Sequence, residues 1–177
     1  MLTVLLCLSL CVCSQGSPLG CRWLEEKFTQ YSSLSLNLLD NMRRVTPPNS
    51  SLEAEDTAIF PEVLYRQTFN ASAEDRLAFA AQILNETAAL FEEDYSGASW
   101  EEKSVENFVN ILTQQADNLG SCVASPGQSR SKELHKYFTR ISTHILRKTD
   151  HSAGAWELVR EKIRSLLMRA HLLLTTH

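Results

Sequence analysis

The sequence has little glycine and proline, with six Gly and five Pro among its 177 residues. It contains no internal repeat and no long low-complexity tract, and no segment alternates apolar and polar residues as a strand would. These absences argue against repeat and β-rich architectures. Apolar and aromatic residues make up 44% of the chain, enough for one buried core.

Motifs of catalysis are also absent. The sequence has no G-x-S-x-G, G-x-x-x-x-G-K-[ST], C-x-x-C or H-E-x-x-H, and no Glu is followed three residues later by His, as a di-iron site in a helical bundle requires. Surface or boundary positions explain the five histidines without a metal. We therefore expect neither an enzyme nor a bound cofactor or metal. The histidines are His135, His144, His151, His171 and His177.

The N-terminus has the pattern of a secretory signal peptide. Residues Leu2 to Val12 form an almost unbroken apolar run, and small and polar residues follow it. The run lacks a preceding Lys or Arg, and we expect cleavage after Gly16, with Ser14 and Gly20 as alternatives. A membrane anchor is the competing interpretation, but eleven apolar residues are too few to span about 30 Å of hydrocarbon. We expect a secreted protein whose single domain covers residues 21–177.

Removal of the signal peptide leaves two cysteines, Cys21 and Cys122. An even pair in an oxidising compartment is most simply one disulfide, with two unpaired thiols as the alternative. Such a bridge closes a loop of about a hundred residues, for which chain entropy gives roughly 4–5 kcal/mol before strain is subtracted.

Helical periodicity recurs in five stretches of the mature chain. They are residues 22–44, 72–91, 99–119, 131–148 and 155 into the 170s. The second starts at Ser72 with acidic residues in its first turn, and its wide apolar arc predicts the central helix of a bundle. Gly120 is expected to stop the third. The expected inner faces are Leu24, Phe28, Tyr31, Leu38 and Met42; Leu77, Ala80, Ala81, Leu84, Ala88 and Phe91; Val105, Phe108, Val109, Leu112, Ala116 and Leu119; Leu134, Tyr137, Phe138, Ile141 and Ile145; and Trp156, Val159, Ile163, Leu167 and Ala170.

A long connection separates the first two predicted helices. It runs from Val45 to about Asn70, begins with two prolines, and carries a possible short turn at residues 61–66. Such a crossover fits an all-α bundle strung like a helical cytokine. The connection contains two N-x-[ST] sequons, at Asn49 and Asn70. A third sequon, at Asn85, falls on the polar side of the second helix, so all three are candidate glycosylation sites.

Charge is unevenly distributed along the chain. Nine acidic and two basic residues lie between Glu74 and Glu106, whereas six basic and one acidic residue lie between Arg130 and Lys148. Solvated helix surface explains most such charge, and the functional interpretation is that the two blocks steer protein partners. Nucleic acid is a poor fit because no basic and aromatic residues interleave.

Three segments together resemble the type I interferons. Residues 154–163, GAWELVREKI, are similar to the C-A-W-E-x-V-R signature of the family's last helix. Residues 135–145, HKYFTRISTHI, resemble the fourth helix, and residues 98–123 resemble the third helix with its cysteine. Gly154 stands where many members have a second-bridge cysteine, and the long connection also lacks Cys. This pattern resembles the two-cysteine interferons of fishes, with Cys21–Cys122 retained.

The resemblance implies a cytokine that joins two class II cytokine receptor chains at the cell surface and induces antiviral genes through Janus kinases and STAT factors. One receptor chain would contact the first connection and the last helix, and the other the second to fourth helices. Trp156 of the signature is expected in the core. The alternatives are an interferon-lambda or interleukin-10 relative and a secreted helical carrier of an apolar ligand. The expected outward-facing receptor contacts of the last helix are Arg160, Glu161, Arg164, Ser165 and Met168.

Overall fold

The computed structural model describes residues 21–42, 58–123 and 130–176, and within these ranges it contains helices and no strand. The helix α6 (Lys132–Arg140) continues without a break as the π-helical η2 (Ile141–Leu146) and the 3₁₀ turn η3 (Arg147–Thr149). A further 3₁₀ turn, η1 (Ser96–Ala98), precedes α5 (Glu102–Ser121). The α-helices are α1 (Cys21–Glu26), α2 (Phe28–Asn41), α3 (Glu62–Phe69), α4 (Ala73–Leu90), α5 (Glu102–Ser121), α6 (Lys132–Arg140) and α7 (Ala153–Thr175).

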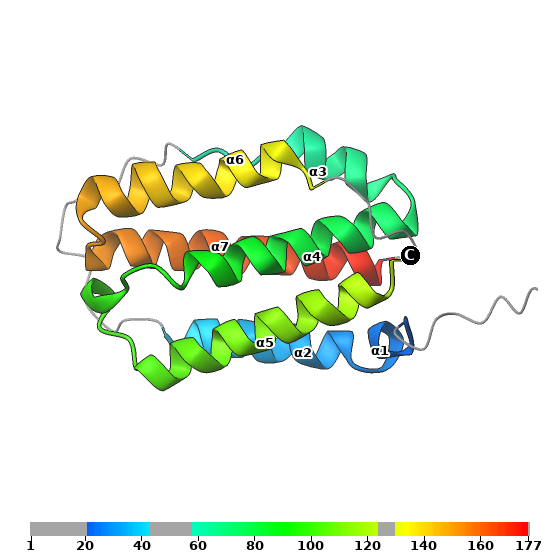
Figure 1. Cartoon of the computed structure of the whole chain (residues 1–177), viewed down its shortest axis with the longest axis horizontal. Coiled ribbons are helices and arrows are strands. Elements are labelled where there is room, and N and C mark those ends of the chain that lie inside the picture. The colour runs from blue at the N-terminus through cyan, green and yellow to red at the C-terminus, as the bar shows by residue number, and fades with distance from the viewer. Residues whose placement is uncertain (1–20, 43–57, 124–129, 177) are drawn as a thin grey trace, which may run out of the picture.

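The long helices form one bundle (Figure 1). In the view of Figure 1, α2, α4 and α6 run in one direction while α5 and α7 run in the other. Helix α4 packs against α5, α6 and α7, and α2 closes the opposite side by packing on α5 and α7. This central position of α4 agrees with the wide apolar arc of its sequence, and the all-α cytokine-like bundle is confirmed.

Serine side chains begin three of the helices. Ser72 Oγ accepts a hydrogen bond from Asp75 N at 3.1 Å, as predicted for the start of α4. Ser131 and Ser152 cap α6 and α7 in the same way, through Leu134 N and Ala155 N. Each cap satisfies one of the backbone N–H groups that a helix start leaves without an intrahelical acceptor.

The predicted inner faces of α4, α6 and α7 lie in the core, together with most of the α5 stripe. Val109 on α5 is half-buried at the groove between α4 and α5.

An aromatic cluster closes one end of this core: Phe91 and Trp156 lie 5.5 Å apart between ring centroids, and Phe91 also packs on Phe108 and Trp100. Trp156 is fully buried and its Nε1 donates to the carbonyl oxygen of Asp94 at 3.0 Å, which confirms it as a core residue.

The first helix differs from its prediction in the face that it buries. It breaks briefly at Lys27 into α1 and α2, and Leu24, Tyr31 and Leu38 are only half-buried. The residues that α2 buries are Phe28, Ser32, Ser35 and Leu39, with Met42 just past its end. Ser35 Oγ donates to the carbonyl oxygen of Ser32 at 2.9 Å, so a local hydrogen bond satisfies the buried Ser35 hydroxyl.

Two helix boundaries also depart from the sequence pattern. Gly120 does not end α5, because it keeps helical backbone geometry and the helix continues to Ser121 with Cys122 as its C-cap. At the other end, Ser99 adopts a left-handed conformation with φ of 55°, so α5 begins at Glu102 rather than at 99. The π-helical turn η2 was not predicted, and it brings Ser142 and Leu146 into the interior beside Ile141 and Ile145.

A polar seam joins the parallel helices α4 and α6. Gln82 bonds both backbone groups of Ser131, and Glu86 lies 2.9 Å from Nδ1 of His135. Further along, Ser142 Oγ donates to Glu93 Oε1 at 2.5 Å. Each of these pairs is separated by 49 residues in the sequence, as two parallel helices in fixed register require.

The loops at one end of the bundle approach each other closely. A Cβ atom built on Gly97 would collide with the carbonyl oxygen of His151. Asp150 and His151 both have φ of 51°, the left-handed region that most side chains avoid, so this turn carries backbone strain. The absence of a side chain at Gly97 allows the turn before α7 to pack on η1, which fixes where α7 begins.

Candidate functional site

The five receptor candidates on α7 gather at one open hollow on the molecular surface. All of them line it, and Asp40 of α2 is the sixth lining residue. Helices α2 and α7 pack directly on one another, so the hollow belongs to the surface that these two helices share. We call it the α2–α7 surface: Asp40, Arg160, Glu161, Arg164, Ser165 and Met168.

Arg160 is buried, so the prediction that it faces outward is wrong. Only 4% of its surface is exposed. Its guanidinium forms a bidentate salt bridge with Glu157, in which Nε donates to Oε2 at 3.1 Å and Nη2 donates to Oε1 at 2.6 Å. The hydrogen bonds with Glu157 raise the pKa of Arg160, against the opposing effect of burial. Its Nη1 also lies 3.8 Å from Asp40. Arg160 therefore forms the floor of the surface and holds its carboxylates in place.

The remaining four candidates are exposed as expected. Arg164 Nε donates to Asp40 Oδ1 at 2.8 Å, and its Nη1 lies 3.2 Å from the sulfur of Met168. Met168 is 43% exposed, a large apolar side chain in contact with solvent beside a cation. Glu161 and Ser165 complete the exposed strip of α7. A strip with a charged centre and an exposed apolar side chain is suited to binding another protein.

Asp40 was missed by the sequence analysis. It joins α2 to α7 through Arg164, yet nothing in its local sequence marks it among the polar residues of the first helix. Only the packing of α2 on α7 brings it to the candidate residues.

Residues 58–69, the described end of the long connection, are bonded to another side of α7. Arg169 lies over the rings of Phe60 and Tyr65, at 4.6 and 5.2 Å from their centroids, and pairs with Glu62 at 2.6 Å. Tyr65 in turn donates from its hydroxyl to the Arg169 carbonyl oxygen at 3.2 Å, and burial raises the pKa of that hydroxyl. Lys162 Nζ donates to the Ala58 carbonyl oxygen at 3.1 Å.

This attachment leaves two apolar side chains in solvent. Ile59 is 77% exposed and Val63 is 62% exposed, although both belong to the segment whose Ala58, Glu62 and Tyr65 are bonded to α7. The exposed strip of α7 is therefore flanked by α2 on one side and by residues 58–69 on the other. The helix α3 itself was expected as no more than a short turn at residues 61–66, and it extends to Phe69.

The other predicted sites lie apart from this surface. Asn70 is exposed at the C-cap of α3 and donates from Nδ2 to the Arg66 carbonyl oxygen, while Asn85 is half-buried on α4. Asn49 and the predicted signal peptide lie outside the described residues. Helix α1 begins at Cys21 and packs on α5, whose C-cap Cys122 is buried, but the Cys21 side chain is outside the described part. The bridge between them stays a prediction.

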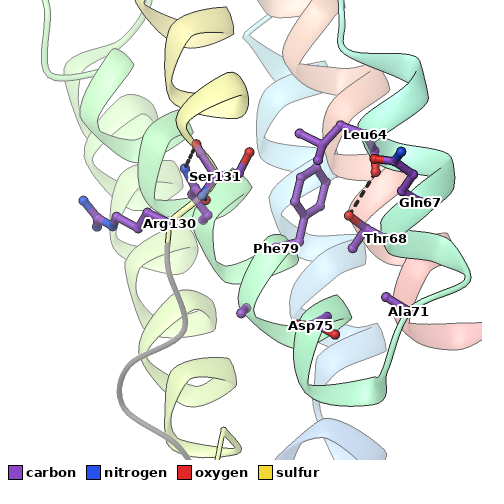
Figure 2. A pocket seen from close by; sticks show the side chains of 10 residues that line it. Leu64, Gln67, Thr68, Ala71, Asp75, Phe79, Arg130 and Ser131 are labelled. Carbon is purple, nitrogen blue, oxygen red and sulfur yellow. Dashed lines mark hydrogen bonds between the residues drawn. The ribbon is translucent and has the colours of Figure 1, made fainter.

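A further hollow lies between α3, α4 and the start of α6 (Figure 2). Leu64, Gln67 and Thr68 line one wall, Phe79 lies in the middle, and Arg130 extends away from Leu64 and Phe79. Across residues 21–42, 58–123 and 130–176, no group of three His, Cys, Asp or Glu side chains is placed to hold a metal ion, and no helix is long and apolar enough to cross a membrane.

Comparison with known proteins identifies the family of this fold. Residues 24–177 match the interferon alpha/beta domain. The chain is 34% identical to interferon a3 of Oncorhynchus mykiss over 169 residues, which covers 94% of this chain and 93% of the relative. It is 30% identical to interferon alpha-1 of Bos taurus over 91% of this chain and 88% of the relative.

A solved structure agrees with these sequence matches. Zebrafish interferon 1 superposes with a TM-score of 0.67 at 30% identity, covering 88% of this chain and 98% of the zebrafish chain. The match supports neither the interleukin-10-like cytokine nor the apolar carrier weighed above. With its helical bundle, its last-helix signature and these relatives, the chain belongs to the type I interferon family.

Proposed function

We propose that this chain is a secreted interferon that binds two different class II cytokine receptor chains and so induces antiviral genes through Janus kinases and STAT factors. One receptor chain binds the α2–α7 surface together with residues 58–69, and the other binds the face made by α4, α5 and α6. The observation that carries the proposal is the convergence of all five candidate residues on one open hollow of α7. Proteins of this family are cytokines, and nothing in the site suggests catalysis.

The physical character of the α2–α7 surface supports protein binding. Its charged groups are already paired within the chain, Arg164 with Asp40 and Arg160 with Glu157, so they are held in a fixed geometry before a partner arrives. Such preorganisation lowers the entropy cost of binding. Met168, with Ile59 and Val63 on the neighbouring segment, offers apolar contact area that water does not stabilise.

The test uses protein secreted by cells that express the full chain and purified from their medium. Fish cells with an interferon-inducible reporter are treated with this protein, and then the same cells lacking either receptor chain. We expect induction in the parent cells and its loss in each knockout. Failure of folded, species-matched protein to induce the reporter would contradict the proposal.

A matched pair of variants connects the activity to the surface. Arg164→Ala removes an exposed cation of the α2–α7 surface, and we expect it to weaken receptor binding about tenfold, equivalent to about 1.4 kcal/mol. Lys27→Ala removes an exposed cation between α1 and α2 and should leave binding unchanged. Equal effects of the two substitutions would remove the assignment of this surface.

A further inference from the structure

Helix α6 and its continuation present a line of cations to solvent. The buried face is formed by Leu134, Tyr137, Phe138 and the apolar residues of η2, which leaves the opposite face outward. That outward face carries the basic stripe, defined as Lys132, Lys136, Arg140, Arg147 and Lys148, all of which are exposed. In Figure 1, α6 lies at the edge of the bundle beside α3, so the stripe lies along an outer edge of the molecule.

Among the described residues, no carboxylate pairs with Lys132, Lys136, Arg140 or Lys148 of the stripe. Glu86 on α4 and Glu93 just past its end are 13% and 19% exposed, and their partners are His135, Ser142, Arg147 and His151. Arg147 is the stripe member that shares in this pairing, at 3.5 Å and with 62% of its side chain exposed. Glu133 is the one acidic residue between Arg130 and Lys148.

The spacing suits a long, repeating anion rather than a single small one. Lys132, Lys136 and Arg140 follow one another at four-residue intervals, which places them on one side of the helix. At roughly 1.5 Å per residue, the stripe from Lys132 to Lys148 extends over about 24 Å. An anion of small size could bridge only neighbouring cations, whereas an extended polymer can contact all of them and release their counterions together.

The residues around the stripe discriminate among polyanions. The aromatic side chains of α6, Tyr137 and Phe138, are buried, so no base-stacking platform accompanies the cations. The large exposed apolar side chains of the described residues are Leu34, Ile59, Val63, Met168 and Leu172, and none is on α6. A membrane-surface helix needs such side chains to enter the lipid.

We propose that the basic stripe binds a sulfated polysaccharide of the extracellular matrix. Sulfate esters carry permanent charge, and the flexible sugar polymer can follow the helix without stacking or apolar insertion. The proposal rests on the proposed function only in assuming secretion, because the polymer is extracellular. Since the whole chain has a net charge of −4, retention by a polyanion has to come from a local surface.

The test is chromatography of the purified secreted protein on immobilised heparin, with salt elution. Wild type should be retained at about 0.15 M salt and elute at higher salt, with an affinity that falls steeply with ionic strength. The variant Lys132→Gln/Lys136→Gln/Arg140→Gln should lose retention, with a decrease in affinity of about tenfold or more. Gln is a good helix former, and circular dichroism should show unchanged helix content.

The matched control removes the same charge elsewhere. Lys27→Gln/Arg66→Gln/Lys103→Gln takes three exposed cations from other parts of the chain and should elute with wild type. Desulfated heparin should compete poorly, and single-stranded DNA and phosphatidylserine vesicles should compete less well than heparin. Equal loss in both triple variants, no retention of wild type, or stronger competition by DNA or vesicles would overturn the proposal.

The reporter assay on wild-type protein keeps the two proposals apart, since the triple variants also change cations on α5 and α6, which belong to the face proposed for the second receptor chain. Retention on heparin by a protein that induces no reporter would reject the receptor proposal and support the polysaccharide site. Reporter induction by a protein that heparin does not retain would support the receptor proposal and reject the polysaccharide site.

Discussion

Asp40 on α2 accepts a 2.8 Å hydrogen bond from Nε of Arg164 on α7, and the same carboxylate lies 3.8 Å from Nη1 of the buried Arg160. One acidic side chain thus links an exposed arginine and a buried arginine of the last helix to the first helix. The two arginines lie one turn apart, but Arg160 is buried and Arg164 is exposed, so we expect a structural role for the first and a binding role for the second.

The first prediction separates these two arginines. Arg160→Ala should lower the free energy of unfolding by about 1–3 kcal/mol, because it removes a paired and almost fully buried cation. Arg164→Ala should cost less than about 1 kcal/mol, since its pair with Asp40 is half exposed. Urea unfolding and receptor binding are measured for both. Unchanged stability of Arg160→Ala with lost binding would instead make Arg160 a direct receptor contact.

The second prediction concerns the Cys21–Cys122 bridge. Reduction, or Cys122→Ala, should lower stability by up to about 4–5 kcal/mol, because the reduced unfolded chain regains the entropy of a loop of about a hundred residues. Thermal unfolding with and without reductant measures the loss, and thiol titration of the unfolded protein counts the free sulfhydryls. Two titratable thiols in protein unfolded without reductant would contradict the bridge.

The third prediction concerns acid stability. Burial raises the pKa of Glu93, but hydrogen bonds from Ser142 and His151 and the charge of Arg147 outweigh it and leave that pKa below its ordinary value of 4.5. The unfolded chain therefore binds this proton more tightly, so the stabilisation is present above about pH 4.5 and is lost as pH falls through the folded pKa. Glu93→Gln should reduce the loss of stability between about pH 6 and pH 3, whereas Glu92→Gln at the exposed neighbour should not. Parallel curves for wild type and Glu93→Gln would contradict the assignment.

The fourth prediction concerns Thr87, the third residue of the Asn85 sequon, whose hydroxyl is buried. Thr87 is fully buried, and its Oγ1 has no hydrogen-bond partner among the described residues. Thr87→Val should therefore keep or raise stability, by up to about 1 kcal/mol, while it abolishes glycosylation at Asn85. Thr87→Ser keeps the sequon and serves as the control.

Occupancy of that sequon is read from secreted protein. Glycosidase treatment should increase the mobility of wild type and Thr87→Ser by one glycan more than that of Thr87→Val. Equal shifts for all three proteins would show that Asn85 is not modified.

The helices could be predicted because their apolar residues recur every three or four positions and because three of them begin with a serine cap. Ser72 is the clear case, since it caps α4 with Asp75 in the first turn. The errors arise where a local pattern competes with tertiary contact. Ser32 and Ser35 are polar yet buried, because the packing of α2 on α5 and α7 decides which of its residues are covered. Gly120 is a helix stop by propensity, but the helix that contains it continues for one more residue.

The placement of the candidate residues on one side of α7 was predictable, and so was the exposure of four of them, whereas the burial of Arg160 was not. Their role in receptor binding stays a prediction. The burial of Arg160 depends on Glu157 in the preceding turn and on Asp40 from another helix. A periodicity argument treats arginine as exposed, and it has no means of seeing a carboxylate that is more than a hundred residues away.

The seam between α4 and α6 has a consequence for variation in this molecule. Because Gln82, Glu86 and Glu93 all pair at the same sequence separation, a shift of α6 by one residue would break every contact at once. The alignment of the two helices is therefore all-or-none. A residue inserted between α5 and α6 changes the sequence separation but can leave these pairs in place. A residue inserted within α6 after Ser131 moves every later pair out of register unless the helix absorbs it as a bulge. A π-helical turn, such as η2, is the local geometry that holds one extra residue in this way.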